Sequence, residues 1–372
     1  MHLSEKSYPG NCNTERLLTT GGEYYQSLIS SLDAAQISID FEVYIFEPVG
    51  VGYDVVEALI NASRRGVTVR LLMDGFGSAA FSREIIETLQ LGGVNVRIFH
   101  PLPWLFWQWH GKDSLLNRIQ QLNHRNHRKT CVIDDEVAFV GSFNVSQVHL
   151  GKEKGGEGWQ DLGLKLTGCR FSPLKQAFQK AWSRKFWHYP KIMPKGVFRL
   201  NFSKVRRRRC HQDLLQRIEQ AEKKIWISNA YFVPGFRLLK VLSEAAKRGV
   251  DVKIVLSTQS DIIFIPWVSS VFYHLLLCSG VKIFEYQLGI MHKKVMMIDD
   301  WVTLGSSNLN HRSFLHDLEV DVVVQTEEVR SQLLSTFEQD LVDCQKVEQN
   351  RLASSGIKYW LGRFLLYFRY WM

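Results

Sequence analysis

The feature that most constrains this chain is a motif that it contains twice, the second copy 165 residues after the first. The motif reads H-x-K-x4-D, and a G-S-x-N sequence follows it closely. The two copies span residues 127–144 and 292–308. Each runs through an apolar stretch that is typical of a β-strand. A single copy would often arise by chance, but two copies in matching contexts predict two related halves that share one site.

In a strand, residues i and i+2 point to the same face, so the histidine and the lysine of each motif share a face. These pairs are His127 with Lys129 and His292 with Lys294. Asp134 and Asp299 come seven residues after the histidines, and this odd separation places them on the opposite face. We therefore expect both aspartates to be structural unless the strand ends first, although as motif members they stay among the candidate catalytic residues.

The rest of the chain is duplicated as well. Residues 58–72 resemble residues 241–255, and residues 92–99 resemble residues 279–285. In both halves a helix is closed by a glycine and lies between two apolar strands, which is a β-α-β unit. We expect an α/β protein of two similar halves, packed as an intramolecular pseudo-dimer with one active site between them.

The expected elements follow the hydrophobic periodicity. Helices are predicted at 23–35, 55–65, 174–187, 212–223 and 238–248, and strands at 37–46, 67–73, 225–233 and 250–256. Pro190 and Pro194 interrupt a helical run and predict a boundary near 189–195. The halves are then residues 1–193 and 194–350, with a tail at 351–372, and residues 1–22 are expected to be a loose lead-in.

Composition narrows the possible partners. The hydrophobic content of 45% supplies ample material for a buried core, and the net charge of +9 predicts attraction to an anion. Nucleic acid, an anionic membrane surface and a phosphorylated substrate all fit that charge. The six cysteines lack C-x-x-C spacing, which suits a reducing compartment and argues against zinc. His124 beside His127 is not enough for a metal site, so we expect no metal and no cofactor.

The ends of the chain predict its location. The N-terminal segment lacks the apolar core of a signal peptide. No uncharged apolar run reaches the roughly 18 to 20 residues that a spanning helix needs. We expect a protein that is made and kept on the cytoplasmic side.

The repeated residues indicate a reaction if the two strands meet at one pocket. One imidazole, His127 or His292, can attack an electrophile while the other protonates the leaving group. The two lysines, with Asn144 and Asn308, would supply positive charge and N–H donors to an anionic centre. A phosphodiester is the natural substrate. Ser142 and Ser306 are expected either to line the pocket or to close a turn.

A histidine nucleophile also needs a partner on its other ring nitrogen. Asp161 and Glu319 each follow a G-S-x-N turn, and each could orient a histidine. Asp317 competes with Glu319 for this role. The sequence leaves open which carboxylate pairs with which histidine.

With its doubled HKD motif, the chain resembles the phospholipase D superfamily over nearly its whole length. Within it, the chain is most similar to bacterial cardiolipin synthases that lack N-terminal membrane helices. The supporting stretches are residues 37–46, 71–78, 305–313 and 318–320. Two positions depart from the family pattern: His311 stands where proline is usual, and Ser142 where a second glycine is common.

The resemblance implies a metal-independent transesterification through a phosphatidyl-histidine. His127 would take a phosphatidyl group from phosphatidylglycerol or a related lipid, with phosphatidylethanolamine as a further candidate. His292 would act as the acid and then the base, and an incoming phosphatidylglycerol would complete cardiolipin. By the same resemblance, Asp161 and Glu319 match the acidic residues that hold the histidines. Water as the acceptor would make the enzyme a phospholipase.

Two rival functions remain: a nuclease of the same superfamily and a non-catalytic membrane scaffold. A nuclease would explain the basic charge through stacking aromatics and cations in the cleft. The scaffold is disfavoured because both motifs are intact. We expect phospholipid substrates and no nucleic acid.

Two aromatic segments suggest contact with an anionic membrane. Residues 357–372 mix aromatics, including Trp360 and Trp371, with Lys and Arg, which is typical of an interfacial helix. Trp104, Trp107 and Trp109 precede the first motif and predict a lipid-entry lip. The alternatives are a helix docked on the protein itself and ordinary core aromatics. The stretch 262–267 and the basic run 204–209 are weaker candidates for lipid contact. We expect a peripheral protein on the cytoplasmic side of the bacterial inner membrane.

Overall fold

The computed structural model describes residues 12, 14–79, 81, 83–101, 123–184, 196–348 and 357–367. In the first half the elements are β1 (Thr14–Leu18), α1 (Gly21–Ala34), β2 (Ser38–Val43), α2 (Val51–Arg64), β3 (Thr68–Asp74), α3 (Arg83–Leu91), β4 (Asn95–Phe99), β5 (Thr130–Ile133), β6 (Val137–Gly141), β7 (Gly163–Thr167) and α5 (Ser172–Ser183), with 3-10 turns at Gln147–His149 and Lys152–Lys154. In the second half they are β8 (Phe198–Leu200), α6 (Lys204–Gln220), β9 (Lys224–Asn229), α7 (Phe236–Lys247), β10 (Asp251–Ser257), α8 (Ile265–Ser270), α9 (Tyr273–Cys278), β11 (Lys282–Tyr286), β12 (Lys294–Ile298), β13 (Trp301–Gly305), α10 (His311–Leu315), β14 (Val320–Val323), α11 (Glu327–Val342) and β15 (Cys344–Lys346), followed by α12 (Ile357–Leu365).

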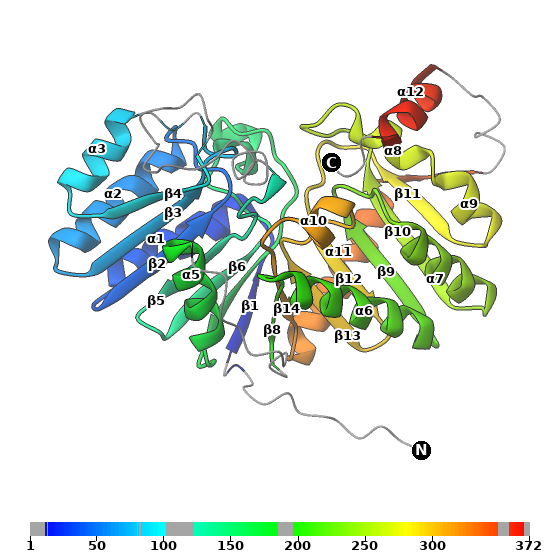
Figure 1. Cartoon of the computed structure of the whole chain (residues 1–372), viewed down its shortest axis with the longest axis horizontal. Helices are drawn as coiled ribbons and strands as arrows, with labels where there is room; N and C mark the ends of the chain where they lie inside the picture. The colour runs from blue at the N-terminus through cyan, green and yellow to red at the C-terminus, as the bar shows by residue number, and fades with distance from the viewer. Residues whose placement is uncertain are drawn as a thin grey trace.

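The duplication in the sequence is a duplication of the fold (Figure 1). The first sheet has the order β1-β7-β6-β5-β2-β3-β4. The second repeats it as β8-β14-β13-β12-β9-β10-β11 and adds β15 at the edge. Strands β2, β3 and β4 are parallel, as are β9, β10 and β11, whereas the strands that carry the motifs run antiparallel to them. The predicted fold class, α/β with two similar halves, is confirmed.

Local sequence explains the helix ends. Helices α2 and α7 each stop at an Arg-Gly pair whose glycine has positive φ, 94° at Gly66 and 96° at Gly249. This conformation is open to glycine and costly for other residues, so the glycine turns the chain directly into β3 or β10.

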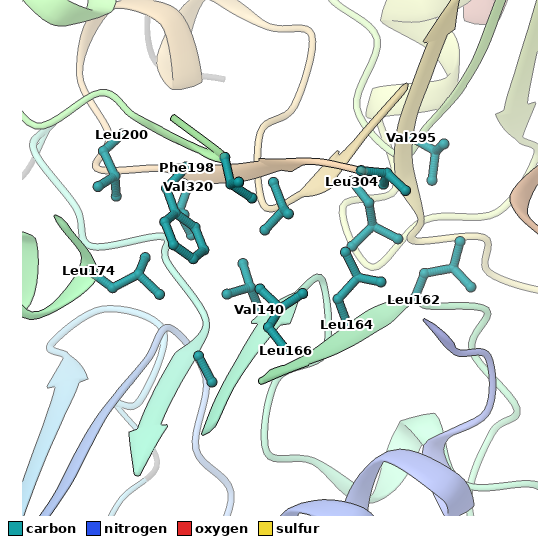
Figure 2. Packing of buried hydrophobic residues seen from close by; sticks show 14 of the residues in the cluster. Val140, Leu162, Leu164, Leu166, Leu174, Phe198, Leu200, Val295, Leu304 and Val320 are labelled. Atoms are coloured by element: carbon teal, nitrogen blue, oxygen red, sulfur yellow. The ribbon is translucent and has the colours of Figure 1, made fainter. Parts of the chain in front are cut away.

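The two sheets pack against each other through a dry hydrophobic core. Figure 2 shows Val140 and Leu164 of the first sheet opposite Leu304 and Val320 of the second. Helices α5 and α11 contribute to the same cluster, while α1, α2, α6 and α7 cover separate cores in their own halves. This packing fixes the two motif strands relative to each other.

The N-terminal segment differs from its prediction as a loose lead-in. Residues Thr14–Leu18 form β1, which pairs with β7 along its whole length. The carboxylate of Glu15 accepts hydrogen bonds from the backbone N–H groups of Gln325 and Thr326, so β1 also ties the first half to the second. The side-chain pattern alone could not show that an edge strand was needed here.

Two cysteines also differ from expectation. Cys12 and Cys169, 157 residues apart, form a disulfide that the cysteine pattern did not predict. They meet because β1 lies antiparallel to β7. The predicted boundary at 189–195 lies outside the described residues.

The motif aspartates lie at the ends of their strands away from the catalytic histidines. Asp134 accepts hydrogen bonds of 2.8 Å from the backbone N–H groups of residues 36–38, and Asp299 accepts three of 2.9 to 3.0 Å from residues 222–224. Each adopts positive φ, 55° and 50°, which Asp tolerates better than most residues. Both side chains thus bind backbone N–H groups, and a part for them in the chemistry stays a prediction. They cap the starts of β2 and β9. Each motif strand ends one residue before its aspartate, so the parity argument does not apply to these two side chains.

We predict that Asp299→Asn lowers stability without touching the chemistry. Asn tolerates the same φ but loses the charge and presents N–H to backbone donors, so the free energy of unfolding should fall by about 1 to 2 kcal/mol. Denaturant unfolding measures this, with the exposed neighbour Asp300→Asn as the control. A variant as stable as the wild type that fails to turn over substrate would contradict the structural role.

Candidate active site

The four motif side chains meet where the two halves join. They precede or begin the antiparallel strands β5 and β12, at the carboxyl ends of the parallel strands. His127, Lys129, His292 and Lys294 are all at most 7% exposed. In each motif the lysine Nζ donates to the carbonyl of its own histidine, over 2.8 Å from Lys129 and 2.6 Å from Lys294. In each motif one tyrosine lies beside both side chains, Tyr44 in the first and Tyr231 in the second, which agrees with the expected sharing of a face.

Each histidine is held by a carboxylate from the other half. His127 Nδ1 lies 3.0 Å from Glu319 Oε2, and His292 Nδ1 lies 2.8 Å from Asp161 Oδ1. This crossed pairing answers the question that the sequence left open. With Nδ1–H donating to a carboxylate, Nε2 of each ring is the atom left to react.

Backbone hydrogen bonds across the junction explain the crossing. The His127 N–H donates to the Leu318 carbonyl over 3.0 Å, directly before Glu319. The His292 N–H donates to the Gln160 carbonyl over 2.7 Å, directly before Asp161. Each motif therefore enters the site beside the opposite half's carboxylate.

The environments of the two carboxylates differ. Glu319 accepts hydrogen bonds from Ser306 Oγ at 2.5 Å and from Ser313 Oγ at 2.6 Å. Burial raises the pKa of Glu319. Burial acts in the same direction on Asp161, but His292 and His149 hold the pKa of that carboxyl well below its usual range.

Asp317, the competing carboxylate, does not hold a histidine. Its Oδ2 accepts a hydrogen bond of 2.8 Å from Arg312 Nε, and its Oδ1 accepts one of 3.2 Å from the Arg125 backbone N–H. Asp317 therefore holds the backbone at Arg125, two residues before His127, and does not orient the ring of a motif histidine.

Burial lowers the pKa values of the lysines and of His127, so these groups lose their protons more easily than in water. Desolvation lowers the pKa of Lys294 to about 7, although Asp161 opposes the shift. Burial also lowers the pKa of Lys129, opposed by Glu319. The pKa of His127 is well below its usual value because of burial and the nearby lysines. A neutral His127 with an exposed lone pair on Nε2 is suited to act as a nucleophile.

The G-S-x-N residues line the site in different ways. Each serine hydroxyl bonds the backbone of the neighbouring segment, Ser142 at Leu162 and Ser306 at Val320, and Ser306 also donates to Glu319. The Asn144 Oδ1 accepts the Ile45 N–H over 3.2 Å, which leaves its amide group as a donor. Asn308 is 3% exposed, and its Oδ1 has no hydrogen-bond partner among the described residues.

Aromatic residues form walls that the sequence analysis missed. Tyr44 packs edge-on against His127 with ring centroids 4.8 Å apart. Trp159 and Tyr231 lie 6.0 and 5.9 Å from the ring of His292. Tyr44 stands in the quoted stretch 37–46, but nothing in its spacing marked it as a wall of the site.

The expected membrane segments are only partly described. Trp104, Trp107, Trp109 and Trp371 lie outside the described residues. Helix α12 packs on α8: a Cβ at Gly362 would overlap the Trp267 backbone, while Trp360 is 59% exposed. Within the described ranges, no helix is long and apolar enough to cross a membrane.

Known proteins resemble this chain over most of its length. A family model described as "Cardiolipin synthase, PLD-like domain" matches residues 28–154 and again 214–341. Cardiolipin synthase B of Escherichia coli is 31% identical, over 91% of this chain and 83% of that protein. A cardiolipin synthase of Clostridium perfringens is 30% identical, over 92% of this chain and 73% of that protein.

A solved structure shares the fold. Phosphatidylserine synthase of Haemophilus influenzae superposes with a TM-score of 0.70 at 12% identity, over 98% of both chains. At this identity the likeness concerns the fold alone. The two matched domains and the relatives cover both halves, and the chain therefore belongs to the phospholipase D superfamily, in the family described as cardiolipin synthase, PLD-like domain.

Proposed function

We propose that the protein is a cardiolipin synthase that moves a phosphatidyl group to phosphatidylglycerol through a phosphatidyl-histidine. The observation that carries the proposal is the crossed pair of buried His–carboxylate units, flanked by two lysines, in one interface. The curated relatives named as cardiolipin synthases support the choice of substrate.

In the first step, His127 Nε2 attacks the phosphorus of a donor phospholipid. The P–N bond forms as the P–O bond to the head group breaks, and His292 Nε2 gives its proton to the departing oxygen. Lys129 and Lys294 stabilise the charge that gathers on the non-bridging oxygens. Phosphatidylglycerol is the expected donor, with phosphatidylethanolamine as a second candidate.

In the second step, the hydroxyl of an incoming phosphatidylglycerol gives its proton to His292 and attacks the phosphorus. The P–N bond breaks, His127 is restored and cardiolipin leaves. Water in place of this alcohol would yield phosphatidic acid, so exclusion of water by the buried site favours transfer.

We predict that His127→Ala and His292→Ala each reduce cardiolipin formation by at least about 10³-fold, because attack and proton transfer each lose their only group. Purified protein is incubated with phosphatidylglycerol vesicles, with and without phosphatidylethanolamine and without added metal, and lipids are identified by mass spectrometry. The exposed His274→Ala serves as the control.

The products decide between the alternatives. Cardiolipin that depends on His127 supports the synthase, and phosphatidic acid alone would make the enzyme a hydrolase. No lipid product, together with cleavage of nucleic acid, would favour the nuclease. Full activity in either His127→Ala or His292→Ala would contradict a mechanism in which both histidines share one site.

The lowered lysine pKa gives a prediction for pH. The cation at Lys294 is lost as pH rises through a pKa of about 7, so kcat/KM should fall above roughly this pH rather than near the 10.5 of an ordinary lysine. A pH profile at constant ionic strength measures the fall. A kcat/KM that stays flat to about pH 9.5 would show that Lys294 keeps an ordinary pKa or is not needed.

We also propose that the protein binds the cytoplasmic face of an anionic membrane through α12. Leu365 and Leu366 pack inward on the cluster of Ile265 and Val268, and Arg363 lies 5.6 Å from the ring of Trp360. The outer side of α12 carries Trp360, 59% exposed, and is followed by Tyr367, 84% exposed. Aromatics beside a cation are suited to the lipid head-group region.

We predict that Trp360→Ser with Tyr367→Ser weakens binding to phosphatidylglycerol-containing vesicles by at least about tenfold, because exposed apolar area no longer enters the interface. Vesicle co-sedimentation measures the binding, with phosphatidylcholine vesicles for comparison. The control is Ile37→Ser, which is 68% exposed at the end of β2 away from the site. Equal losses in both proteins would contradict a specific role for α12.

A further inference from the structure

Two imidazoles share the fully buried carboxylate of Asp161. His292 Nδ1 lies 2.8 Å from Oδ1, and His149 Nδ1 lies 2.9 Å from Oδ2. The two atoms are within ion-pair distance, although the N–H of His149 is not aimed at Oδ2 closely enough for a hydrogen bond. His149 is 3% exposed, and the reaction steps above give it no task.

The backbone hydrogen bond to His149 defines the tautomer of its ring. The backbone N–H of Asn144 donates to His149 Nε2 over 3.3 Å. A backbone N–H can only donate, so Nε2 carries the lone pair and the ring proton sits on Nδ1, facing Asp161. Through this ring, with Nε2 on the Asn144 backbone and Nδ1 beside Asp161, His149 links the G-S-x-N turn to the carboxylate holding His292.

The second half repeats this link with different side chains. Ser313 follows Asn308 by five residues, as His149 follows Asn144. Ser313 Oγ accepts the Asn308 N–H over 3.2 Å and donates to Glu319 over 2.6 Å. The first half thus combines the short carboxylate side chain of Asp161 with the long side chain of His149. The second half combines the longer Glu319 with the short Ser313.

We propose that His149 and Ser313 are positioning residues, each serving one catalytic histidine, and that their difference makes the two histidines unequal. His149 would act on proton transfer by His292, and Ser313 on attack by His127. This inference rests on the proposed phosphatidyl transfer for the assignment of steps, whereas the geometry of the two links does not depend on it.

The electrostatics of the carboxylates agree with this division. Asp161 keeps a lowered pKa despite its burial and so stays charged beside His292, which favours the protonated ring that an acid needs. Burial and then Lys294 lower the pKa of His292, and Asp161 and Asp261 oppose that shift. Glu319 has a raised pKa, and His127 beside it is the more suitable neutral nucleophile.

Two substrates with different leaving groups distinguish the role of His149 from that of Ser313. Loss of phosphatidylglycerol's glycerol needs a proton from His292, whereas p-nitrophenolate leaves from phosphatidyl-p-nitrophenol without one. In the first turnover, His149→Ala should slow the glycerol substrate by at least about tenfold and leave the p-nitrophenyl substrate within about threefold of wild type. Ser313→Ala should slow both. Equal effects of His149→Ala on both substrates, or no effect on either, would overturn the proposal.

Exchanging the side chains of Asp161 and His149 for those of the other half gives a variant that should regain activity. A regain of activity distinguishes the proposed role from a loss caused by misfolding. Asp161→Glu and His149→Ser each break the length match, while the double variant rebuilds the Glu–Ser combination of the other half. The double variant should exceed the worse single variant in first-turnover rate by at least about tenfold. A double variant no better than either single variant would contradict the matched-length argument.

A measurement without substrate keeps the inference separate from the proposed function. In protein labelled with ¹⁵N-histidine, His149 should show the Nδ1–H tautomer, and His149→Ala should shift the Nδ1–H signal of His292 but not that of His127. The opposite tautomer would overturn the inference. Wild-type protein that turns over neither lipid would instead refute the proposed function.

Discussion

The active site depends on two reciprocal sets of backbone hydrogen bonds across the junction of the halves. His127 and His292 each donate a backbone N–H to the residue that precedes the carboxylate of the opposite half. A hydrophobic core shared by the two sheets keeps the bonded segments in place. Neither motif histidine is paired with a carboxylate of its own half, so the candidate site belongs to the junction.

Burial at that junction changes the chemistry of ordinary side chains. Two lysines and two carboxylates share a site with little access to water, where charges interact more strongly than at the surface. Opposite charges balance one another, and the remaining cost of burial appears as lowered lysine pKa values. A site preorganised in this way for an anionic phosphorus centre needs little rearrangement during the reaction.

The duplication gives the two halves the same scaffold, and they differ in a few side chains and at their edges. The halves share strand order, the glycine-closed helices and the aspartate caps. They differ in the links through His149 and Ser313. They also differ at their edges, since β15 and α12 have no counterpart among the described residues of the first half. Differences of this kind give the two motif histidines unequal surroundings.

The sequence by itself determined the α/β class, the duplication into two similar halves, and the candidate histidines and lysines of the site. Periods of 2 and 3.6 and the motif spacing are local information. The tertiary structure alone decided that Glu319 holds His127 and Asp161 holds His292, across separations of 192 and 131 residues. The same holds for β1, the disulfide, the link through His149 and the docking of α12. These features depend on which surfaces pack together, and no local spacing encodes that choice.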